Sequence, residues 1–547
     1  MKKMAKILSM LLVVSMLFTG CSGGGATPNG DSAVSSENSG TSSESNAETG
    51  DSAVALTVWT TMHALEAKAI TDPSENRALQ EILKLYKEET GKEVTLTFEY
   101  PPVGMEEENF SLMISSGTYP DMIWYDIESA YKGGVAQAIA DNVVMDVTEI
   151  VEAEGTNFKN AFKSMPEILK GMYNDNGQLI KFGSSTPVIN QETGELDVRC
   201  FIGPVARKDL LDAAGLKAED IKTIADWENM LTKFKEAGVS VPLGWGATGW
   251  EVLSPTFIAA FGTTNDFQRD DDVISYGPIT EGYKAWLETF NRWYQNGLLD
   301  PNFATNKYFE NVQTDMMAGK VGATCYHIAD LTVYNQSVLE EYPERELVPL
   351  DLPVAKEGDK IRKRDAFDTL YGTSKYVTTS CKTPEEAVKF VDFLYDPRAN
   401  EFSMWGIEGE SYIKEDGNYV STESYKNDPN ARWVYTSDLR LLGMYDARRL
   451  DESYVLDAQQ DAFTMWGKHG YDLAMPSLGI TFTTEEDSAR VSKMADITTR
   501  VQEMTFEFII NGVNDESWES YVSGIKEMGI EDVIKIYQDA YNRYLER

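Results

Sequence analysis

Apolar and polar positions recur with two different periods along most of the chain. Residues 54–60 alternate apolar or β-branched residues with polar ones, which is typical of a strand. Pro73 follows at a position that suggests a first helical turn. Leu79, Ile82 and Tyr86 then recur at helical spacing before Gly91, which predicts a helix that ends there. A second alternating run occupies residues 94–98. The order strand, helix, strand predicts a βαβ unit, and therefore a parallel sheet covered by helices.

The same alternation of strands and helices continues toward the C-terminus. A third strand is predicted at residues 122–125, and Asn-Gly at 176–177 predicts a hairpin turn because both residues tolerate positive φ. Further helices are predicted at residues 109–116, 207–214, 283–296 and 518–547, the last interrupted at Gly529. Others begin at Thr383 and at Thr223, where residues 223–226 resemble a capping box. The fold class is therefore α/β.

The N-terminus has the pattern of a secretory signal. Lys2, Lys3 and Lys6 precede an apolar run at residues 7–18, which is too short to span a bilayer, and small residues lead to Cys21. The junction resembles a lipobox, which implies that Cys21 is lipidated after cleavage of residues 1–21. The alternative is an ordinary signal peptide with an incidental cysteine.

A polar segment follows at residues 22–53. It consists almost entirely of Ser, Gly, Asn, Glu, Thr, Ala and Asp, so it cannot bury enough apolar surface to fold. Such a composition predicts a flexible tether. A lipid and a tether would place the folded part at the extracellular face of the cytoplasmic membrane.

Composition limits what the folded part can be. The chain has 547 residues, of which 42% are hydrophobic, so it is long enough for two or three globular lobes. The net charge of −39 disfavours nucleic acid and anionic lipid as partners. Cys200, Cys325 and Cys381 lack zinc or redox spacing, and the acidic run 270–272 lacks the spacing of an EF-hand loop. We therefore expect no cofactor and no metal.

Seven short segments match one family in order along the chain. They are Ser-Ser-Gly-Thr-Tyr-Pro-Asp-Met-Ile at 115–123, Arg-Lys-Asp-Leu-Leu-Asp-Ala-Ala-Gly-Leu at 207–216, Asn-Gly-Leu-Leu-Asp-Pro at 296–301, Met-Ala-Gly-Lys-Val-Gly at 317–322, Thr-Pro-Glu-Glu-Ala-Val-Lys-Phe at 383–390, Gly-Ile-Glu-Gly-Glu at 406–410 and Ile-Asn-Gly at 510–512. The chain thus resembles the carbohydrate-type extracellular solute-binding proteins of family 1, which serve ABC importers.

This resemblance implies a two-lobed fold with hinge segments and a ligand in the cleft between the lobes. By analogy, the first lobe is residues 54–165 plus 328–400, and the second is residues 166–327 plus 401–547. The resemblance also implies a monomer that captures a sugar or oligosaccharide and delivers it to the permease of an ABC importer.

A sugar has flat faces of C–H bonds and a rim of hydroxyls, so aromatic rings and planar polar groups suit it. Strand ends, the glycine-spaced loop 245–250 and the segments carrying the resemblance supply the candidates. These are Trp59, Trp124, Asp126, Trp245, Trp250, Tyr326, His327, Trp405, Glu408 and Arg207. The alternative for Trp59 is a core position, and for Trp245 and Trp250 it is a loop filled by its own rings. For His327 it is a structural role, for Trp405 and Glu408 a packed helix end, and for Arg207 a structural ion pair.

Two other functions remain open. A surface glycosidase needs two carboxylates across a cleft, and 88 acidic residues cannot exclude such a pair. No serine-hydrolase, zinc-protease, P-loop or dinucleotide motif is present in the sequence, and only three histidines are available. An adhesin would need no enclosed pocket. The resemblance to binding proteins favours a role without catalysis.

Overall fold

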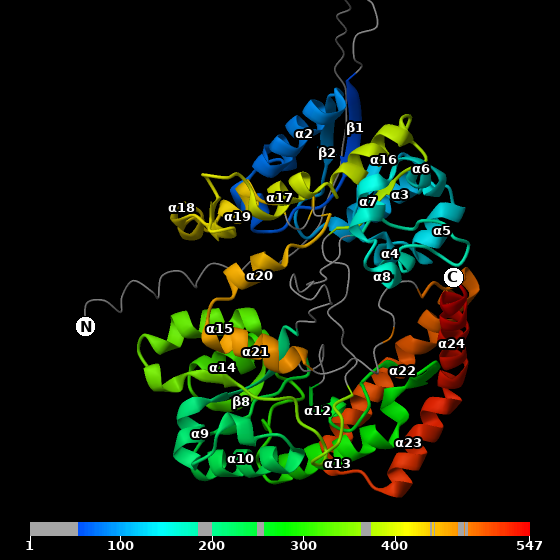
Figure 1. Ribbon diagram of the computed structural model, residues 1–547. Helices are drawn as coiled ribbons and strands as arrows, with labels where there is room; N and C mark the ends of the chain where they lie inside the picture. The colour runs from blue at the N-terminus through cyan, green and yellow to red at the C-terminus, as the bar shows by residue number, and fades with distance from the viewer. Residues whose placement is uncertain are drawn as a thin grey trace, which may run out of the picture. The chain divides into compact units, whose positions relative to one another are not determined.

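Two four-stranded sheets, each covered by its own helices, organise the chain (Figure 1). The computed structural model describes residues 53–183, 200–248, 256–362, 373–437, 440–441, 443–468, 475 and 480–547. We call the residues that pack on the first sheet the first lobe, and those that pack on the second sheet the second lobe.

The first sheet has the strand order β10-β3-β1-β2. Its strands are β1 (Val54–Trp59), β2 (Val94–Glu99), β3 (Met122–Trp124) and β10 (Lys375–Val377). β1 runs parallel to β2 and β3, with Leu56 opposite Leu96, so the predicted βαβ unit is confirmed. β10 is antiparallel to β3 and makes this a mixed sheet. The apolar positions of β1 and β2 are buried, as their alternation predicts.

Local capping signals set the ends of α2 (Arg77–Thr90), the helix that joins β1 to β2. The Asn76 side chain accepts a hydrogen bond from the Leu79 amide at 3.1 Å, and Gly91 ends the helix with φ 72°. Pro73, where the sequence suggests a first helical turn, instead begins a separate 3₁₀ turn. Ile82 and Tyr86 face the core.

The first lobe contains further helices besides α2. They are α1 (Glu66–Ala69), α3 (Glu106–Ser116), α4 (Ile127–Ala130), α5 (Gly134–Ala140), α6 (Thr148–Glu154), α7 (Thr156–Ala161), α8 (Pro166–Lys170), α16 (Pro384–Phe393), α17 (Pro397–Trp405), α18 (Glu423–Asn427) and α19 (Ala431–Tyr435). α16 begins at Pro384 as predicted, but the Thr383 side chain makes no capping hydrogen bond. The hairpin of β11 (Tyr412–Glu415) and β12 (Asn418–Ser421) packs near α20 (Ala447–Ser453).

The second sheet has the order β5-β8-β4-β9. Its strands are β4 (Ile202–Arg207), β5 (Val241–Leu243), β8 (Val321–His327) and β9 (Leu347–Pro349). β5 is parallel to β8, whereas β4 is antiparallel to both β8 and β9. Every residue of β4 is buried, which is expected for a central strand covered on both faces.

The helices of the second lobe follow the capping signals of the sequence. They are α9 (Lys208–Ala214), α10 (Ile224–Glu236), α12 (Thr256–Ala259), α13 (Glu281–Gln295), α14 (Gln313–Met317), α15 (Ile328–Tyr334), α21 (Asp457–Gly467), α22 (Thr484–Asn511), α23 (Asp515–Glu527) and α24 (Ile530–Glu546). The capping box of Thr223 and Asp226 is present at α10. Gly529 separates α23 from α24 at φ 94°. Figure 1 shows α22 beside α13, and the two are in contact.

The expected lobe boundaries differ from the observed packing at three places. Residues 328–352, expected in the first lobe, pack with the second, because β9 pairs with β4 and Leu350 lies in that core. Residues 166–182, expected in the second lobe, place Met172 and Phe182 in the core of the first. The expected lobe boundary between residues 327 and 328 was based on analogy. The observed boundary depends on strand pairing between segments that are far apart in the sequence.

The third difference concerns residues 401–441, which were expected in the second lobe. α19 packs against α1 and α2, and Leu441 lies in the first core. The chain therefore changes lobe between residues 182 and 202, between 352 and 375, and between 441 and 457. From α21 onward the buried residues belong to the cores of the second lobe.

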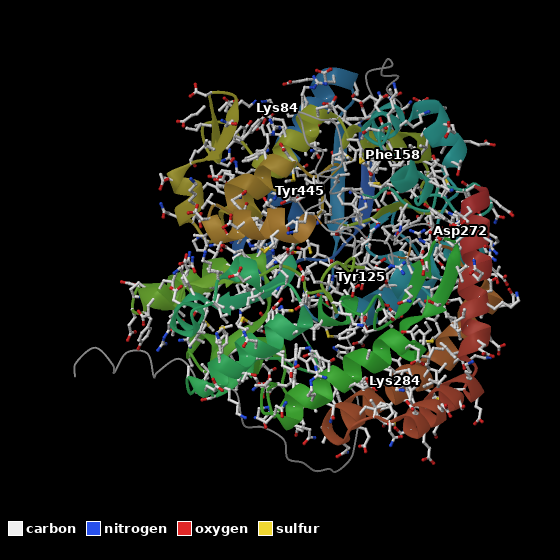
Figure 2. The ribbon with its side chains drawn as sticks, turned by 60° about the horizontal axis from the view of Figure 1, so that its bottom comes forward. Lys84, Tyr125, Phe158, Asp272, Lys284 and Tyr445 are labelled. Carbon is white, nitrogen blue, oxygen red and sulfur yellow. The ribbon has the colours of Figure 1, made fainter. Side chains whose placement is uncertain are left out.

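The acidic run 270–272 forms the turn between β6 (Phe267–Asp270) and β7 (Val273–Tyr276). The carboxylate of Asp270 pairs with Arg362 at 2.8 Å, and that of Asp272 accepts a hydrogen bond from the Tyr541 hydroxyl at 3.2 Å. Figure 2 shows Asp272 beside α24 and Lys284 on α13, while Phe158 lies within the first lobe. The run therefore connects the hairpin to neighbouring elements.

Residues 1–52 lie outside the described part, so the signal peptide, Cys21 and most of the tether stay predictions. No helix among the described residues is long and apolar enough to cross a membrane. Cys200, Cys325 and Cys381 are buried free thiols.

Candidate functional site

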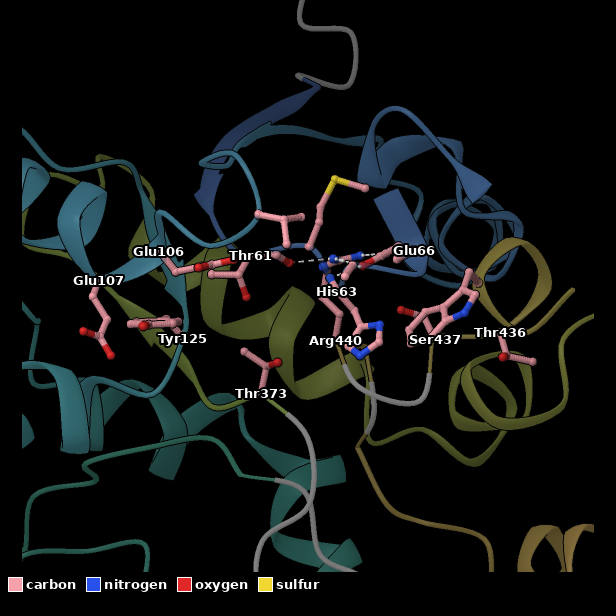
Figure 3. A pocket seen from close by; sticks show the side chains of 14 residues that line it. Thr61, His63, Glu66, Glu106, Glu107, Tyr125, Thr373, Thr436, Ser437 and Arg440 are labelled. Atoms are coloured by element: carbon pink, nitrogen blue, oxygen red, sulfur yellow. Dashed lines mark hydrogen bonds and ion pairs between the residues drawn. The ribbon is translucent and has the colours of Figure 1, made fainter. Parts of the chain in front are cut away.

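A pocket of about 490 Å³ opens at the carboxyl ends of β1 and β3 in the first lobe. Thr61 and Met62 follow β1, Tyr125 follows β3, and Thr373 precedes the antiparallel β10, so all four lie at one edge of the sheet. Open α/β sheets bind ligands at this edge. Figure 3 shows Tyr125 on one side of the pocket and Ser437 on the other, with His63 between them.

A stacked pair of rings forms part of the pocket wall. The rings of His63 and Trp433 lie 4.6 Å apart between centroids, with an interplanar angle of 9°. His63 is exposed, whereas Trp433 is 9% exposed. The Leu65 amide donates to His63 Nδ1 at 3.2 Å, so the ring is held both by stacking and by its own loop. The pair offers a flat surface whose orientation is fixed before a ligand arrives.

A buried ion pair lies beneath this surface. Arg440 donates from Nη1 to Glu66 Oε1 at 2.6 Å and from Nη2 to Glu66 Oε2 at 2.8 Å. Nη2 also donates to the carbonyl of Thr61 at 2.8 Å. The arginine therefore joins the loop after β1 to the segment after α19, and it supports the loop that carries His63.

Polar groups complete the lining. The hydroxyls of Thr61, Thr373 and Ser437 have no hydrogen-bond partner among the described residues. Tyr125 is half-buried, and burial raises the pKa of its phenol, with a further contribution from the carboxylates of Glu107 and Glu106. The phenol is therefore neutral at physiological pH and can donate a hydrogen bond. Unpaired hydroxyls beside a flat ring suit a polyhydroxylated ligand.

Of the predicted residues at the first sheet, Trp59 packs against Tyr125, a residue of the pocket wall. Its ring is 5% exposed and meets the Tyr125 ring at 5.1 Å edge to face. Asp126 is exposed and caps α4 by accepting from the Ser129 amide at 3.4 Å. Neither side chain lines the pocket.

The structure corrects the expectation for Trp124. Its side chain is fully buried, with the ring 5.9 Å from Phe98 in the core of the first lobe. The reason is the alternation of a strand, which directs Trp124 to the covered face while Tyr125, one residue later, reaches the pocket. A ring without exposed surface cannot stack on a ligand in this conformation.

Trp245 lies at a second pocket, of about 480 Å³, in the second lobe. It follows β5 and is 7% exposed, with Trp286 and Tyr283 of α13 also lining the pocket. Phe506 of α22 lines the same space. Trp250 lies outside the described residues. The glycine-spaced loop thus places one of its two tryptophans in the lining of an aromatic pocket, while most of that ring packs in the core of the second lobe.

Tyr326 and His327 end β8 but do not line either pocket. Tyr326 is fully buried, which excludes the expected ligand contact in this conformation. The Ala329 amide donates to His327 Nδ1 at 3.0 Å, so the ring caps α15, and burial lowers the pKa of His327 to about 4. This is the structural role that was the alternative.

The remaining candidates serve the fold. Trp405 is 1% exposed, and its indole nitrogen donates to Asp446 Oδ2 at 2.9 Å. Glu408 is exposed and lies 3.7 Å from the ammonium of Lys414. Arg207 is 6% exposed and donates to Asp209 at 3.0 Å and to the Gly319 carbonyl at 2.6 Å. For Trp405 and Arg207 the alternative of packing or ion pairing is therefore correct, because their own neighbours cover them.

Sequence reasoning missed the residues that define the first pocket. His63 lies in the loop that follows Trp59, and Tyr125 directly follows Trp124. Their positions after strand ends were therefore an available signal. Trp433 and Arg440 had no local signal, because they reach the site only through folding. No group of three or more His, Cys, Asp or Glu side chains in the described part of the chain could hold a metal ion.

Comparison with known proteins identifies similar chains over almost the whole length. The family model described as bacterial extracellular solute-binding protein matches residues 72–401. Lipoprotein LipO of Bacillus subtilis (strain 168) is 22% identical over 485 residues, which cover 84% of this chain and 89% of LipO. The fructooligosaccharide ABC transporter substrate-binding protein FusA of Streptococcus pneumoniae serotype 4 is 21% identical over 507 residues, covering 86% and 88%.

A solved structure shows the same fold. It is the HMO binding ABC-transporter associated solute binding protein of Bifidobacterium longum infantis ATCC 15697. The TM-score is 0.72 at 15% identity, with 90% of this chain and 99% of that chain covered. The predicted two-lobed α/β fold class is thereby confirmed.

Proposed function

The chain belongs to the bacterial extracellular solute-binding protein family, and on this basis we propose that it captures a carbohydrate, most simply an oligosaccharide, for an ABC importer. FusA is named for fructooligosaccharide transport, and the Bifidobacterium protein for HMO binding. These names support a sugar as the ligand class.

The single observation that carries the proposal is the wall of the first pocket. The His63–Trp433 stack is a fixed flat surface, and unpaired hydroxyls of Thr61, Thr373 and Ser437 surround it. A pyranose or furanose ring needs this combination, because its C–H face packs on an aromatic ring while its hydroxyls exchange hydrogen bonds. The volume of about 490 Å³ lies within the usual range for small-molecule sites.

The second lobe would contribute through Trp245. Trp286 and Tyr283, which are 1% and 3% exposed, support this pocket from the core, and its volume is similar to that of the first. Together with Trp250 of the same loop, Trp245 is the site we propose for sugar units beyond the first. Of the five candidate tryptophans, these two remain in the proposal.

The proposed role is binding and not catalysis. Both carboxylate oxygens of Glu66, the buried acid of the first pocket, already accept hydrogen bonds from Arg440. This disfavours Glu66 as the general acid that a glycosidase requires. Incubation with oligosaccharides should release no reducing sugar, and release would instead favour the glycosidase.

We further propose that Cys21 carries a lipid and that residues 22–53 tether the binding lobes to the membrane. LipO, a lipoprotein by name, supports this placement. The permease of an ABC importer is the proposed recipient of the ligand. The working unit would be a monomer, since one chain carries both pockets.

Thermal denaturation with a panel of oligosaccharides tests the ligand class. A cognate sugar should raise the melting temperature by mass action, equivalent to about 2.7 kcal/mol at one hundred times the Kd. Calorimetric titration then gives the affinity and stoichiometry. If no member of a broad panel of neutral and acidic oligosaccharides raises the melting temperature, the proposal is wrong.

A further inference from the structure

The first pocket carries an excess of negative charge near the place proposed for the sugar. Its described lining holds three carboxylates and one guanidinium, and no lysine. The charged residues are Glu66, Glu106, Glu107 and Arg440. Which sugars the pocket can accept depends on which of these charged groups are available to a ligand.

The one guanidinium is committed to the protein. Arg440 is 6% exposed, and three of its hydrogen bonds, at 2.6 to 2.8 Å, go to Glu66 and the Thr61 carbonyl. Its Nε also points to the hydroxyl of Thr60 at 3.4 Å. An anionic ligand would have to compete with a buried carboxylate for this cation, and removing one partner of a buried pair is strongly unfavourable.

Glu106 and Glu107 approach the pocket from the first turn of α3, where the helix dipole favours negative charge. Glu106 accepts from the Gly104 amide at 2.8 Å, which fixes its side chain. Both carboxylates lie close enough to Tyr125 to contribute to the raised pKa of its phenol. Figure 3 shows Glu106 near Thr61 and Glu107 beside Tyr125. Negative charge therefore faces the ligand space from the side opposite Ser437.

From this arrangement we infer that the first pocket binds uncharged sugar rings and rejects sugars that carry a carboxylate, sulfate or phosphate. A neutral sugar hydroxyl can donate to Glu106 or Glu107 and accept from the pocket hydroxyls. An acidic substituent offers acceptors only, meets like charge, and finds no unpaired cation among the lining residues that the structure describes. The net charge of −39 adds repulsion at longer range.

This inference rests on the proposed function and concerns the class of its ligand. The probes are neutral oligosaccharides (fructo-, malto-, manno-, xylo- and galacto-oligosaccharides) and oligouronates from pectin and alginate of the same length. Binding is measured by calorimetric titration of the purified binding lobes with their tether, at low and at moderate salt. We expect at least one neutral series to bind, and every oligouronate to bind at least about tenfold more weakly.

The outcomes separate the two proposals. An oligouronate that binds as tightly as, or tighter than, every neutral series would overturn the inference while leaving carbohydrate binding intact. Binding of no sugar of either kind would overturn the proposed function itself, and the inference with it.

Variants test whether the carboxylates of Glu106 and Glu107 cause the preference for neutral over acidic sugars. In the variant E106Q/E107Q, the ratio of oligouronate Kd to neutral-sugar Kd should fall by about threefold or more. The variant E88Q/E385Q makes the same change of charge at two exposed positions of the first lobe that do not line the pocket, and its ratio should equal that of the parent. Equal ratios in both variants, with melting temperatures like the parent, would contradict the assignment to Glu106 and Glu107.

Discussion

Arg440 and Glu66 form a two-point ion pair, with bonds of 2.6 and 2.8 Å, across 374 positions of sequence. The side chains are 7% and 8% exposed, so the pair is shielded from water. It connects the loop after β1, which carries His63, with the segment after α19, which carries Ser437. The pair thus holds two distant segments together around one pocket.

Removing one member of this pair should be costly. In E66Q or R440M a buried charge loses its partner, and we expect the free energy of unfolding to fall by about 3–5 kcal/mol. The double variant E66L/R440M should lose less than the sum, because no unpaired charge remains. Urea unfolding measures these values. The exposed pair Arg398–Glu89 is the control, where E89Q should cost at most about 1 kcal/mol. Equal losses at both pairs would contradict a structural role for the buried one.

His63 should matter more for binding than for stability. The side chain is exposed and H63A removes one stacked contact with Trp433, so the free energy of unfolding should fall by no more than about 1.5 kcal/mol. Loss of an aromatic contact made only in the complex should weaken affinity by about thirtyfold. Calorimetric titration with the cognate sugar and urea unfolding of the same variant separate the two effects. Unchanged affinity in H63A would show that the sugar does not use this ring.

Trp124 should behave in the opposite way. Its side chain is fully buried in the first core, so W124A should lower the free energy of unfolding by about 3–5 kcal/mol. The Kd of the fraction that remains folded should stay close to that of the parent. Titration at a temperature well below the melting point makes the comparison. A stable W124A protein with weakened binding would restore the tryptophan as a ligand contact.

His327 should make stability depend on pH. Burial holds the pKa of His327 at about 4 in the folded protein, below the value of 6.5 for an unperturbed side chain. As pH falls through 6.5, the unfolded chain binds a proton before the folded protein does, so stability decreases until about pH 4. The loss from this residue should reach at most about 3 kcal/mol.

The variant H327N removes the titrating group and keeps a side chain that can cap α15. Its free energy of unfolding should change less than that of the parent between pH 7 and pH 4.5, as measured by urea unfolding at each pH. The comparison uses the change with pH within each protein, so an offset from lost ring packing does not affect it. Identical changes in both proteins would show that His327 is not the group responsible.

Cys21 should determine whether the protein stays with the membrane. C21A removes the proposed site of lipid attachment, so the variant should remain uncleaved or appear in the culture medium. Fractionation into membrane and medium, together with the mass of the mature N-terminus, checks this. A correctly cleaved C21A protein that partitions with membranes as the parent does would exclude the lipoprotein assignment.

The sequence alone determined the elements whose signals are local. The capping box at Thr223, the helix end at Gly91 and the break at Gly529 all lie where the sequence predicted them. These features depend on hydrogen bonds and φ angles within a few residues, so neighbouring residues specify them. The parallel β1–β2 pair followed from the order of strand, helix and strand over residues 54–99. Motif order was enough to indicate the family.

The tertiary structure decided which lobe each segment joins and which rings face a ligand. β9 pairs with β4 about 140 residues before it, and Trp433 stacks on His63 from 370 positions away. A tryptophan suits both a core position and a ligand contact, so residue type does not distinguish the two. The alternation of the strand and the helices packed on it determine which side chains are covered. Thus Trp124 became core and its neighbour Tyr125 became pocket wall. Contacts between segments distant in sequence are absent from local patterns, because they form only when the whole chain packs.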